Sequence, residues 1–138
     1  MDDKQADLSR EEYIALATFR NALRSFLHFS AEAAKAEGLT PQQHQLLLLI
    51  KGNPDREGVS VTELADGLKI HHNAAVGLVN RCEQSGLVKR SENSEDRRQV
   101  DVTLTPLGAS KLHNLTKQHI QELHSLRSSL DISSLMEK

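Results

Sequence analysis

The fold of this chain is decided by residues 59–104, VSVTELADGLKIHHNAAVGLVNRCEQSGLVKRSENSEDRRQVDVTL. Near its start, Ser60 and Glu63 form an S-x-x-E capping box, in which each side chain satisfies a backbone N–H at the beginning of a helix. Leu64 and Leu68 then recur at the spacing of one apolar helical face. We therefore predict a short helix that begins after Ser60 and ends in a short turn.

A second helix is predicted from about His71 to Ser85. Its inward face follows the i, i+3, i+4, i+7 spacing and consists of Ala75, Leu78, Val79 and Cys82. Gly86 follows at the position where a left-handed residue ends a helix at the least steric cost. Helix, turn and helix is the arrangement in which the second helix can lie in the major groove of DNA.

The remainder of the stretch is predicted to be a charged two-stranded hairpin. Residues 87–90 are strand-like, and residues 98–104 alternate between polar and apolar. The alternation puts Val100, Val102 and Leu104 on one face and Gln99, Asp101 and Thr103 on the other. Residues 91–97 between the strands are polar and rich in turn formers, so this tip is expected to project into solvent.

Size and composition indicate one domain with a modest core. The chain has 138 residues, of which 38% are hydrophobic and 3% aromatic, so burial against a second chain is favoured. No run of about 18 apolar residues occurs, and the polar start of the chain has no signal-peptide pattern, so we expect no membrane span and a cytoplasmic location. The single cysteine, Cys82, excludes an internal disulfide and fits a reducing compartment.

The charge is unevenly distributed. The net charge is −2, but residues 69–98 hold six basic residues (Lys69, Arg81, Lys89, Arg90, Arg97, Arg98) against four acidic ones (Glu83, Glu92, Glu95, Asp96). The difference of six and four gives this stretch a charge of +2. A mild basic footprint on an acidic chain is compatible with a nucleic-acid partner.

Long helices are expected on both sides of the central stretch. Ser9 with Glu12 opens a helix to about Glu37, and Thr40-Pro41 and Thr105-Pro106 are further helix starts. We predict a disordered tail at 1–8 and a single domain at 9–138, with a DNA-binding lobe at 40–105 and a dimerisation region made of 9–37 and 106–130. The apolar stripes of the terminal helices need a partner, and a two-fold dimer would place two second helices about 10 base pairs apart. The alternative is a monomeric bundle in which both helices fold onto the lobe.

The outward face of the second helix provides the candidate base contacts. Asn73 can read adenine in a bidentate manner, and Gly77 allows close approach to the groove. His71 and His72 lie at the helix start, where backbone N–H groups favour phosphate. The candidate set is His71, His72, Asn73, Ala74, Val76, Gly77, Asn80 and Arg81. The alternative is that the histidines and Asn73 are polar residues at a helix start with no ligand.

Three segments of the chain resemble one known family. VTELADGLKI (61–70), GLVNRCEQSGLVKR (77–90) and DRRQVDVTLTPLG (96–108) are similar, in order and spacing, to the MarR-type (multiple antibiotic resistance regulator) winged-helix repressors. The resemblance covers about residues 40–112. It implies a mainly α fold with a small β-hairpin wing, that is, a winged helix-turn-helix with N- and C-terminal dimerisation helices. It also implies a sequence-specific, dimeric, DNA-binding transcriptional regulator, here predicted to be a repressor released by a small-molecule effector.

The resemblance also assigns a role to the hairpin tip. In that family an Asp-x-Arg pattern, here Asp96 and Arg98, shapes the wing tip and presents the arginine to the minor groove. A narrow A·T-rich minor groove attracts arginine, whereas a carboxylate is unwelcome near phosphate, so Asp96 is expected to orient Arg98. The candidate wing residues are Lys89, Arg90, Asp96, Arg97 and Arg98. A solvated charged loop without a target is the alternative.

MarR-type proteins typically bind a small aromatic or anionic effector between the dimer helices and the lobe. By resemblance the candidate lining residues are Phe26, Phe29, His44 and His113, for which ordinary packing is the alternative. No cofactor and no metal are expected. A metal- or redox-responsive regulator is an alternative that the sequence disfavours, because the seven histidines form no i, i+4 pair on one helix and Cys82 faces inward.

Two other classes of function compete with DNA binding. The chain has no glycine-rich phosphate loop and no nucleophile elbow, so we do not expect an enzyme. A winged-helix protein–protein interaction module is the other alternative, since fold alone does not define function. The paired arginines of the wing, Arg97 and Arg98, favour DNA binding over protein–protein interaction.

Overall fold

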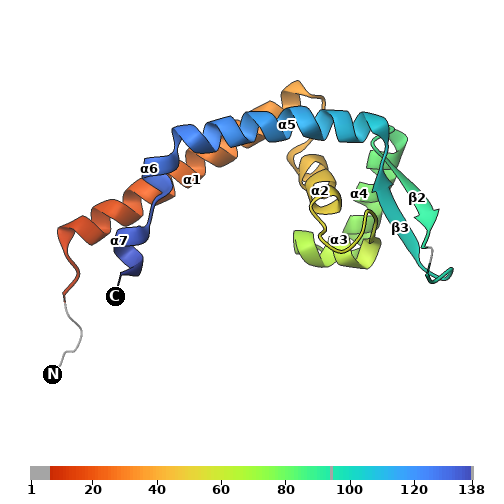
Figure 1. Ribbon diagram of the computed structural model, residues 1–138, viewed down its shortest axis with the longest axis horizontal. Helices are drawn as coiled ribbons and strands as arrows, with labels where there is room; N and C mark the ends of the chain where they lie inside the picture. Colours follow the sequence, from red (N-terminus) through yellow and green to blue (C-terminus); the bar gives the residue numbers. More distant parts are fainter. Residues whose placement is uncertain (1–6, 94, 138) are drawn as a thin grey trace.

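The computed structural model describes residues 7–93 and 95–137, and it is a helix-turn-helix lobe attached to two long helices (Figure 1). The long helices are α1 (Arg10–Ala36) and α5 (Pro106–Ser125), and two short ones follow, α6 (Arg127–Leu130) and α7 (Ser133–Met136). The lobe consists of α2 (Pro41–Lys51), β1 (Val59–Ser60), α3 (Val61–Leu68), α4 (His72–Gln84), β2 (Val88–Glu92) and β3 (Val100–Leu104). The fold is therefore mainly helical with a small antiparallel wing, as predicted.

The helix starts lie where the capping signals put them. Ser9, Thr40 and Ser60 each form a complete capping box, with Glu12, Gln43 and Glu63 as the third helical residues. Thr105 caps α5 by accepting a hydrogen bond from the N–H of Gly108. Gly86 has a φ of +76°, which confirms the left-handed residue predicted after α4. A disordered tail was predicted at residues 1–8, and residues 1–6 of it lie outside the described residues.

The wing has three strands, whereas the sequence predicted a two-stranded hairpin. The strand order is β1-β3-β2, and the two-residue β1 pairs with β3 through Val59 and Val102. Burial along β3 departs from the alternation of apolar and polar residues at two positions, because Asp101 is only 8% exposed and Val100 is 44% exposed. β3 is the central strand, and Gly58 crosses Asp101 so closely that a Cβ on the glycine would lie 2.9 Å from the Asp101 Cβ. Val100 lies beside the tip, beyond the reach of the core.

One hydrophobic core joins the lobe to the long helices. The largest side chains that are less than 2% exposed come from α2, α3, α4, the wing and α5. They are Leu46, Leu47, Ile50, Leu64, Leu78, Val79, Cys82, Leu87, Val88, Val102 and Leu115. The predicted inward face of α4 is confirmed, since Ala75 is also fully buried. Within α2, Leu46, Leu47 and Ile50 face the core, whereas Leu48 is exposed.

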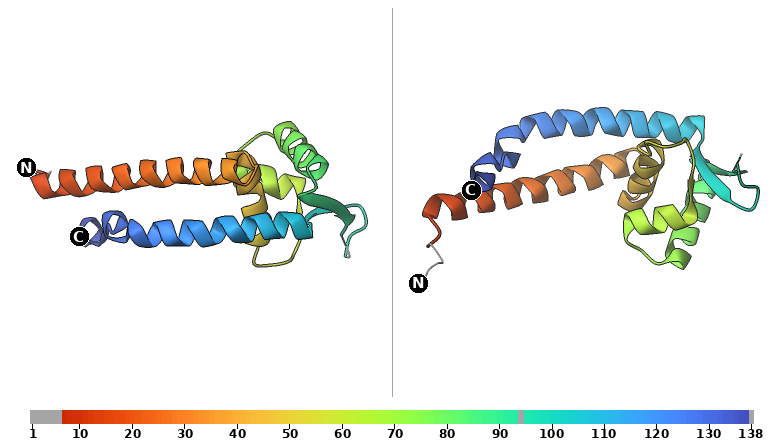
Figure 2. Two further views of the ribbon diagram at one scale, coloured as in Figure 1. Left: turned by 90° about the horizontal axis from the view of Figure 1, so that it is seen from above. Right: turned by 60° about the horizontal axis from the view of Figure 1, so that its bottom comes forward.

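The long helices lie side by side and extend away from the lobe (Figures 1 and 2). The last helix was expected to continue to about Leu130, but α5 ends at Ser125 and α6 packs against α1. Serines at 125, 128 and 129 and Asp131 disfavour a helix interior, and Asp131 accepts a hydrogen bond from the N–H of Ser133. Among residues 7–93 and 95–137, no helix has the length and apolar content needed to span a membrane.

Candidate nucleic-acid interface

The inner face of helix α4 is buried in the core, and its outer face is polar. His71, His72, Asn73, Ala74, Asn80 and Arg81 are exposed, and Val76 and Gly77 are half-buried. The turn before the helix contains Lys69 in the left-handed conformation with φ +61°, the one non-glycine residue of positive φ among the described residues. A Cβ on Gly77 would lie 3.5 Å from a terminal nitrogen of Arg81, so this guanidinium lies over the glycine.

The start of α4 leaves its backbone donors accessible. His71 occupies the N-cap position with extended backbone, but its side chain forms no capping hydrogen bond within the described structure. Uncapped N–H groups at a helix start are the arrangement that favours a phosphate.

A guanidinium connects α4 to the wing. Arg90 on β2 donates from Nη2 to the Oδ1 of Asn80 at 2.7 Å and also contacts the carboxylate of Glu83. Arg90 and Asn80, both candidate DNA contacts, thus also bind one another. Lys89, the preceding candidate, is exposed.

The wing tip holds one arginine out into solvent. The Oδ1 of Asp96 accepts hydrogen bonds from the N–H of Arg98 at 3.0 Å and from its Nε at 3.2 Å. The side chain of Arg98 is nevertheless 90% exposed, and Arg97 is also exposed. Asp96 therefore has the contacts that the predicted orienting role requires.

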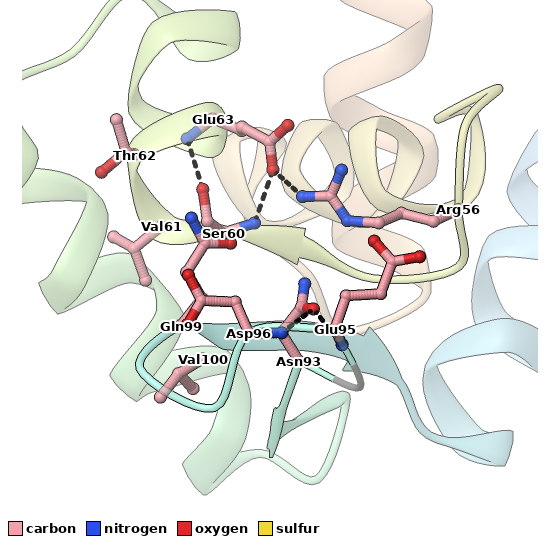
Figure 3. A pocket seen from close by; sticks show the side chains of 10 residues that line it. All are labelled: Arg56, Ser60, Val61, Thr62, Glu63, Asn93, Glu95, Asp96, Gln99 and Val100. Carbon is pink, nitrogen blue, oxygen red and sulfur yellow. Dashed lines mark hydrogen bonds and ion pairs between the residues drawn. The ribbon is translucent and has the colours of Figure 1, made fainter.

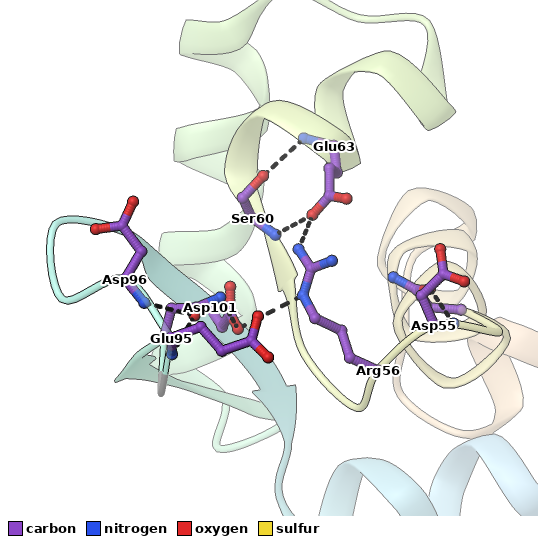
Figure 4. A network of polar contacts seen from close by, with 9 residues as sticks. Asp55, Arg56, Ser60, Glu63, Glu95, Asp96 and Asp101 are labelled. Atoms are coloured by element: carbon purple, nitrogen blue, oxygen red, sulfur yellow. Dashed lines mark hydrogen bonds and ion pairs between the residues drawn. The ribbon is translucent and has the colours of Figure 1, made fainter.

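An open hollow of about 750 Å³ lies between the wing tip and the start of α3 (Figure 3). Arg56 from the loop before β1, Glu63 from α3 and Asn93 from the wing line it. Arg56 contacts Glu63 and reaches Asp101, which Asn93 also contacts (Figure 4). Sequence reasoning missed Arg56, Asn93 and Asp101, because these residues lie on different elements and share no sequence motif.

Three of the four predicted effector residues meet around a histidine. The His119 ring lies 5.6 Å from Phe26, 5.3 Å from Phe29 and 4.8 Å from His44, between ring centroids. Its Nδ1 is 2.6 Å from the Leu115 carbonyl oxygen, and its Nε2 is 2.7 Å from the Ser30 hydroxyl. Burial, followed by the nearby His119, lowers the pKa of His44. These side chains pack against one another.

The fourth effector candidate lies elsewhere. His113 is exposed and lines a separate shallow hollow with Lys51 and Ala109. Cys82 is fully buried, and burial raises the pKa of its thiol to about 11, the opposite of what a redox-sensing thiolate requires. Within residues 7–93 and 95–137, no three metal-ligating side chains of His, Cys, Asp or Glu are placed to hold an ion.

Comparison with known proteins agrees with this geometry. A sequence model of the MarR family matches residues 37–99. The putative transcriptional regulatory protein for the hcr operon of Thauera aromatica is 31% identical over 93 residues, which are 67% of this chain and 54% of that protein. The HTH-type transcriptional repressor MdtR of Bacillus subtilis is 30% identical over 84 residues, covering 61% of this chain and 52% of the repressor. The chain thus spans about half the length of these curated relatives.

Solved structures match almost the whole chain. A MarR family protein from Bacillus stearothermophilus has a TM-score of 0.74 at 18% identity, covering 95% of this chain and 89% of that one. A mutant of MepR from S. aureus, bound to an oligodeoxyribonucleotide, has a TM-score of 0.68 at 17% identity, covering 95% and 91%. At such identities the structures establish the fold, and the sequence matches establish the relationship. The chain belongs to the MarR family of winged-helix transcriptional regulators.

Proposed function

We propose that two copies of this chain bind a pseudo-palindromic DNA operator and repress transcription until a small aromatic or anionic effector releases them. The observation that carries the DNA-binding part is the exposed polar face of α4 beside a wing whose tip arginine, Arg98, is 90% exposed and oriented by Asp96. The family to which the chain belongs and the DNA-bound MepR mutant of the same fold support it. A DNA target and a single buried thiol are both consistent with the cytoplasm.

In this proposal the helix and the wing have different roles. The start of α4, with His71 and Asn73, enters the major groove, where Asn73 reads an adenine and the helix N–H groups approach a phosphate. Arg98 enters the adjacent minor groove, where the negative potential is highest in A·T-rich sequence. Lys89 and Arg97 contact the phosphate backbone and add affinity without adding specificity.

The dimer is proposed from the surface that the chain leaves uncovered. On α1, Tyr13, Ile14, Leu16 and Leu27 are each more than half exposed, and Ile120 is equally exposed on α5. α1 and α5 project beyond the lobe, and no element within residues 7–93 and 95–137 covers these side chains (Figure 2). A second copy would remove this apolar area from water at about 25 cal/mol for each Å². It would also duplicate the α4 and wing surfaces about a two-fold axis.

Repression and effector release are proposed from one relative and from one cluster of side chains. MdtR, one of the relatives, is a repressor by name. The cluster of Phe26, Phe29 and His44 around His119 joins α1, α2 and α5, where the lobe meets the long helices. An effector would have to separate these packed rings, and that change would move the lobe relative to the proposed dimer helices.

A titration with duplex DNA at several salt concentrations tests the DNA-binding proposal. Phosphate neutralisation predicts that log K falls linearly with log salt concentration, with a slope near −0.9 for each phosphate contacted. Fluorescence anisotropy of a labelled random duplex measures this directly. Absence of binding at low salt would instead favour the protein–protein interaction module.

A further inference from the structure

A chain of polar contacts connects the start of α3 to the tip of the wing, and we propose that Arg56 and Asp101 are positioning residues for Arg98. The contacts run from Glu63 through Arg56, Asp101 and Asn93 to the tip (Figure 4). The proposal rests on the proposed function, because Arg98 is taken to contact DNA. It adds that Arg98 reaches the groove only when the buried carboxylate of Asp101 and the guanidinium of Arg56 hold the wing tip in place.

The centre of the chain is a buried carboxylate. Asp101 is 8% exposed, on the middle strand of the wing. Its Oδ2 accepts a hydrogen bond from the Nδ2 of Asn93 at 3.1 Å and lies 3.7 Å from the Nε of Arg56. Its Oδ1 is buried and has no hydrogen-bond partner within the described structure. A buried carboxylate with so few partners depends strongly on those it has.

Asp101 determines which way the amide of Asn93 points. Because Nδ2 donates to the carboxylate, Oδ1 is turned towards the tip, where it accepts the N–H groups of Glu95 at 2.8 Å and Asp96 at 3.0 Å. The reversed amide would place its oxygen against the carboxylate and leave two N–H groups facing an NH₂ group. The turn that Asn93 holds is the same turn in which Asp96 binds Arg98.

Arg56 connects this turn to the helix-turn-helix. Its Nη2 contacts Glu63 Oε1, which also accepts the N–H of Ser60 at 2.9 Å in the capping box of α3 (Figure 3). The Ser60 N–H first, and the Arg56 charge after it, lower the pKa of Glu63, so the carboxylate is ionised at neutral pH. One planar guanidinium therefore spans α3 and β3, which a point-like ammonium group does less well.

The wing tip has little apolar packing with which to fix itself. Val100, beside the tip, is 44% exposed, and Glu95, Arg97, Arg98 and Gln99 are exposed. Two backbone hydrogen bonds close the tip, from the Asn93 N–H to the Gln99 carbonyl and from the Gln99 N–H to the Asp96 carbonyl, both at 3.0 Å. The side-chain hydrogen bonds of Asn93 and Asp96 add the restraints that act next to Arg98. If Arg56 and Asp101 only stabilised the sheet, replacing them would lower the free energy of unfolding. The effect on DNA affinity would then be the same with and without Arg98.

The sharpest test of the positioning role is to exchange the side chains of Asn93 and Asp101, which contact one another at the centre of the chain of contacts. Asn93→Asp keeps the acceptor for the tip but places two carboxylates together, whereas Asn93→Asp combined with Asp101→Asn restores a donor and an acceptor at the wild-type net charge. Gln99→Glu is the matched control, because it adds the same charge to the wing at an exposed position. Arg56→Lys tests the other end of the chain. Circular dichroism and thermal unfolding establish that each variant is folded.

The first measurement needs no DNA. Trypsin cleavage at Arg97 and Arg98, located by mass spectrometry, reports how well the tip is held. We expect cleavage to accelerate in Asn93→Asp and Arg56→Lys, to return towards the wild-type rate in the exchanged pair, and to stay at the wild-type rate in Gln99→Glu. If Asn93→Asp and Gln99→Glu are cut at the same rate, the proposal is wrong.

The second measurement is affinity for duplex DNA, with and without Arg98→Ala. We expect Asn93→Asp to weaken binding by about tenfold, the range expected for one lost arginine contact, and the exchanged pair to recover most of it. In the Arg98→Ala background, Asn93→Asp should cost no more than Gln99→Glu does. An equal loss with and without Arg98 would overturn the positioning role. Failure of the wild type to bind any DNA would contradict the proposed function, while the cleavage rates would still decide whether Arg56 and Asp101 hold the tip.

Discussion

Arg90 of the wing donates a hydrogen bond to Asn80 of α4, with 2.7 Å between Nη2 and Oδ1. The same guanidinium contacts Glu83, about one helical turn further along. The wing and α4 are therefore fixed relative to one another by side chains as well as by the core beneath them. In the proposed complex, the two surfaces that read DNA would move as one body.

Replacement of Arg90 by methionine should loosen this connection. Met keeps the length of the side chain but removes the donors, and we expect the free energy of unfolding to fall by about 0.5–1.5 kcal/mol, the value of one hydrogen bond. The Glu83 contact adds little because both side chains are partly exposed. Urea unfolding measures the change. Lys89→Met, on the same strand but exposed, is the control, and an equal effect of both substitutions would rule out a specific role for Arg90.

Arg98→Ala should weaken operator binding by about 1–3 kcal/mol and leave the fold intact. The side chain is 90% exposed, so its removal creates no cavity. Fluorescence anisotropy with the wild-type operator gives the change in affinity. Arg10→Ala removes the same charge at the first residue of α1, the end of the helix away from the wing, and should have little effect (Figure 1). Unchanged affinity of Arg98→Ala would remove Arg98 from the interface.

Leu16→Glu should dissociate the proposed dimer. Leu16 lies in the exposed apolar stripe of α1, and burying a carboxylate against a second copy is strongly unfavourable without a partner. Sedimentation equilibrium measures the association, and DNA affinity should fall with it. Gln42→Glu, in the first turn of α2 in the lobe, is the control, because it adds the same charge at an exposed position outside the stripe. A wild-type protein that sediments as a monomer would contradict the dimer itself.

Stability should fall as the pH drops below about 6.5, the ordinary pKa of histidine. Burial lowers the pKa of His44 in the folded chain, so the unfolded chain takes up a proton that the folded chain does not. Above this pH His44 is neutral in both the folded and the unfolded chain, so it makes no pH-dependent contribution to the free energy of unfolding. Urea unfolding between pH 5 and pH 8 should show a smaller slope for His44→Leu, while the exposed His124→Leu should keep the wild-type slope. If His44→Leu keeps the wild-type slope, His44 does not contribute to the pH dependence of stability.

The sequence predicted best what depends on neighbouring residues. Ser9, Thr40, Ser60 and Thr105 each cap the helix that follows, because a capping hydrogen bond reaches only two or three residues along the chain. The inward face of α4 was predictable for a similar reason, since its helical period is local. The family motifs supplied Asp96 and Arg98.

The sequence predicted least what depends on distant partners. β1 has only two residues, too few for a pattern, and it is a strand because Val59 meets Val102. Alternation put Asp101 on the face of β3 that Gln99 and Thr103 share, and only the fold shows that Gly58 and Arg56 cover it. Phe26 and His44 were named as candidate effector residues, and only the fold shows them gathered around His119.

The most direct test of the account is selection of duplexes from a random pool by the purified wild-type chain, followed by sequencing. Two copies that each present one α4 and one wing predict a pseudo-palindrome with half-site centres roughly 10 base pairs apart. Sedimentation of the selected duplex should show two chains bound. Enrichment of no sequence, or of a single half-site that binds one chain, would contradict the proposed dimeric DNA-binding regulator.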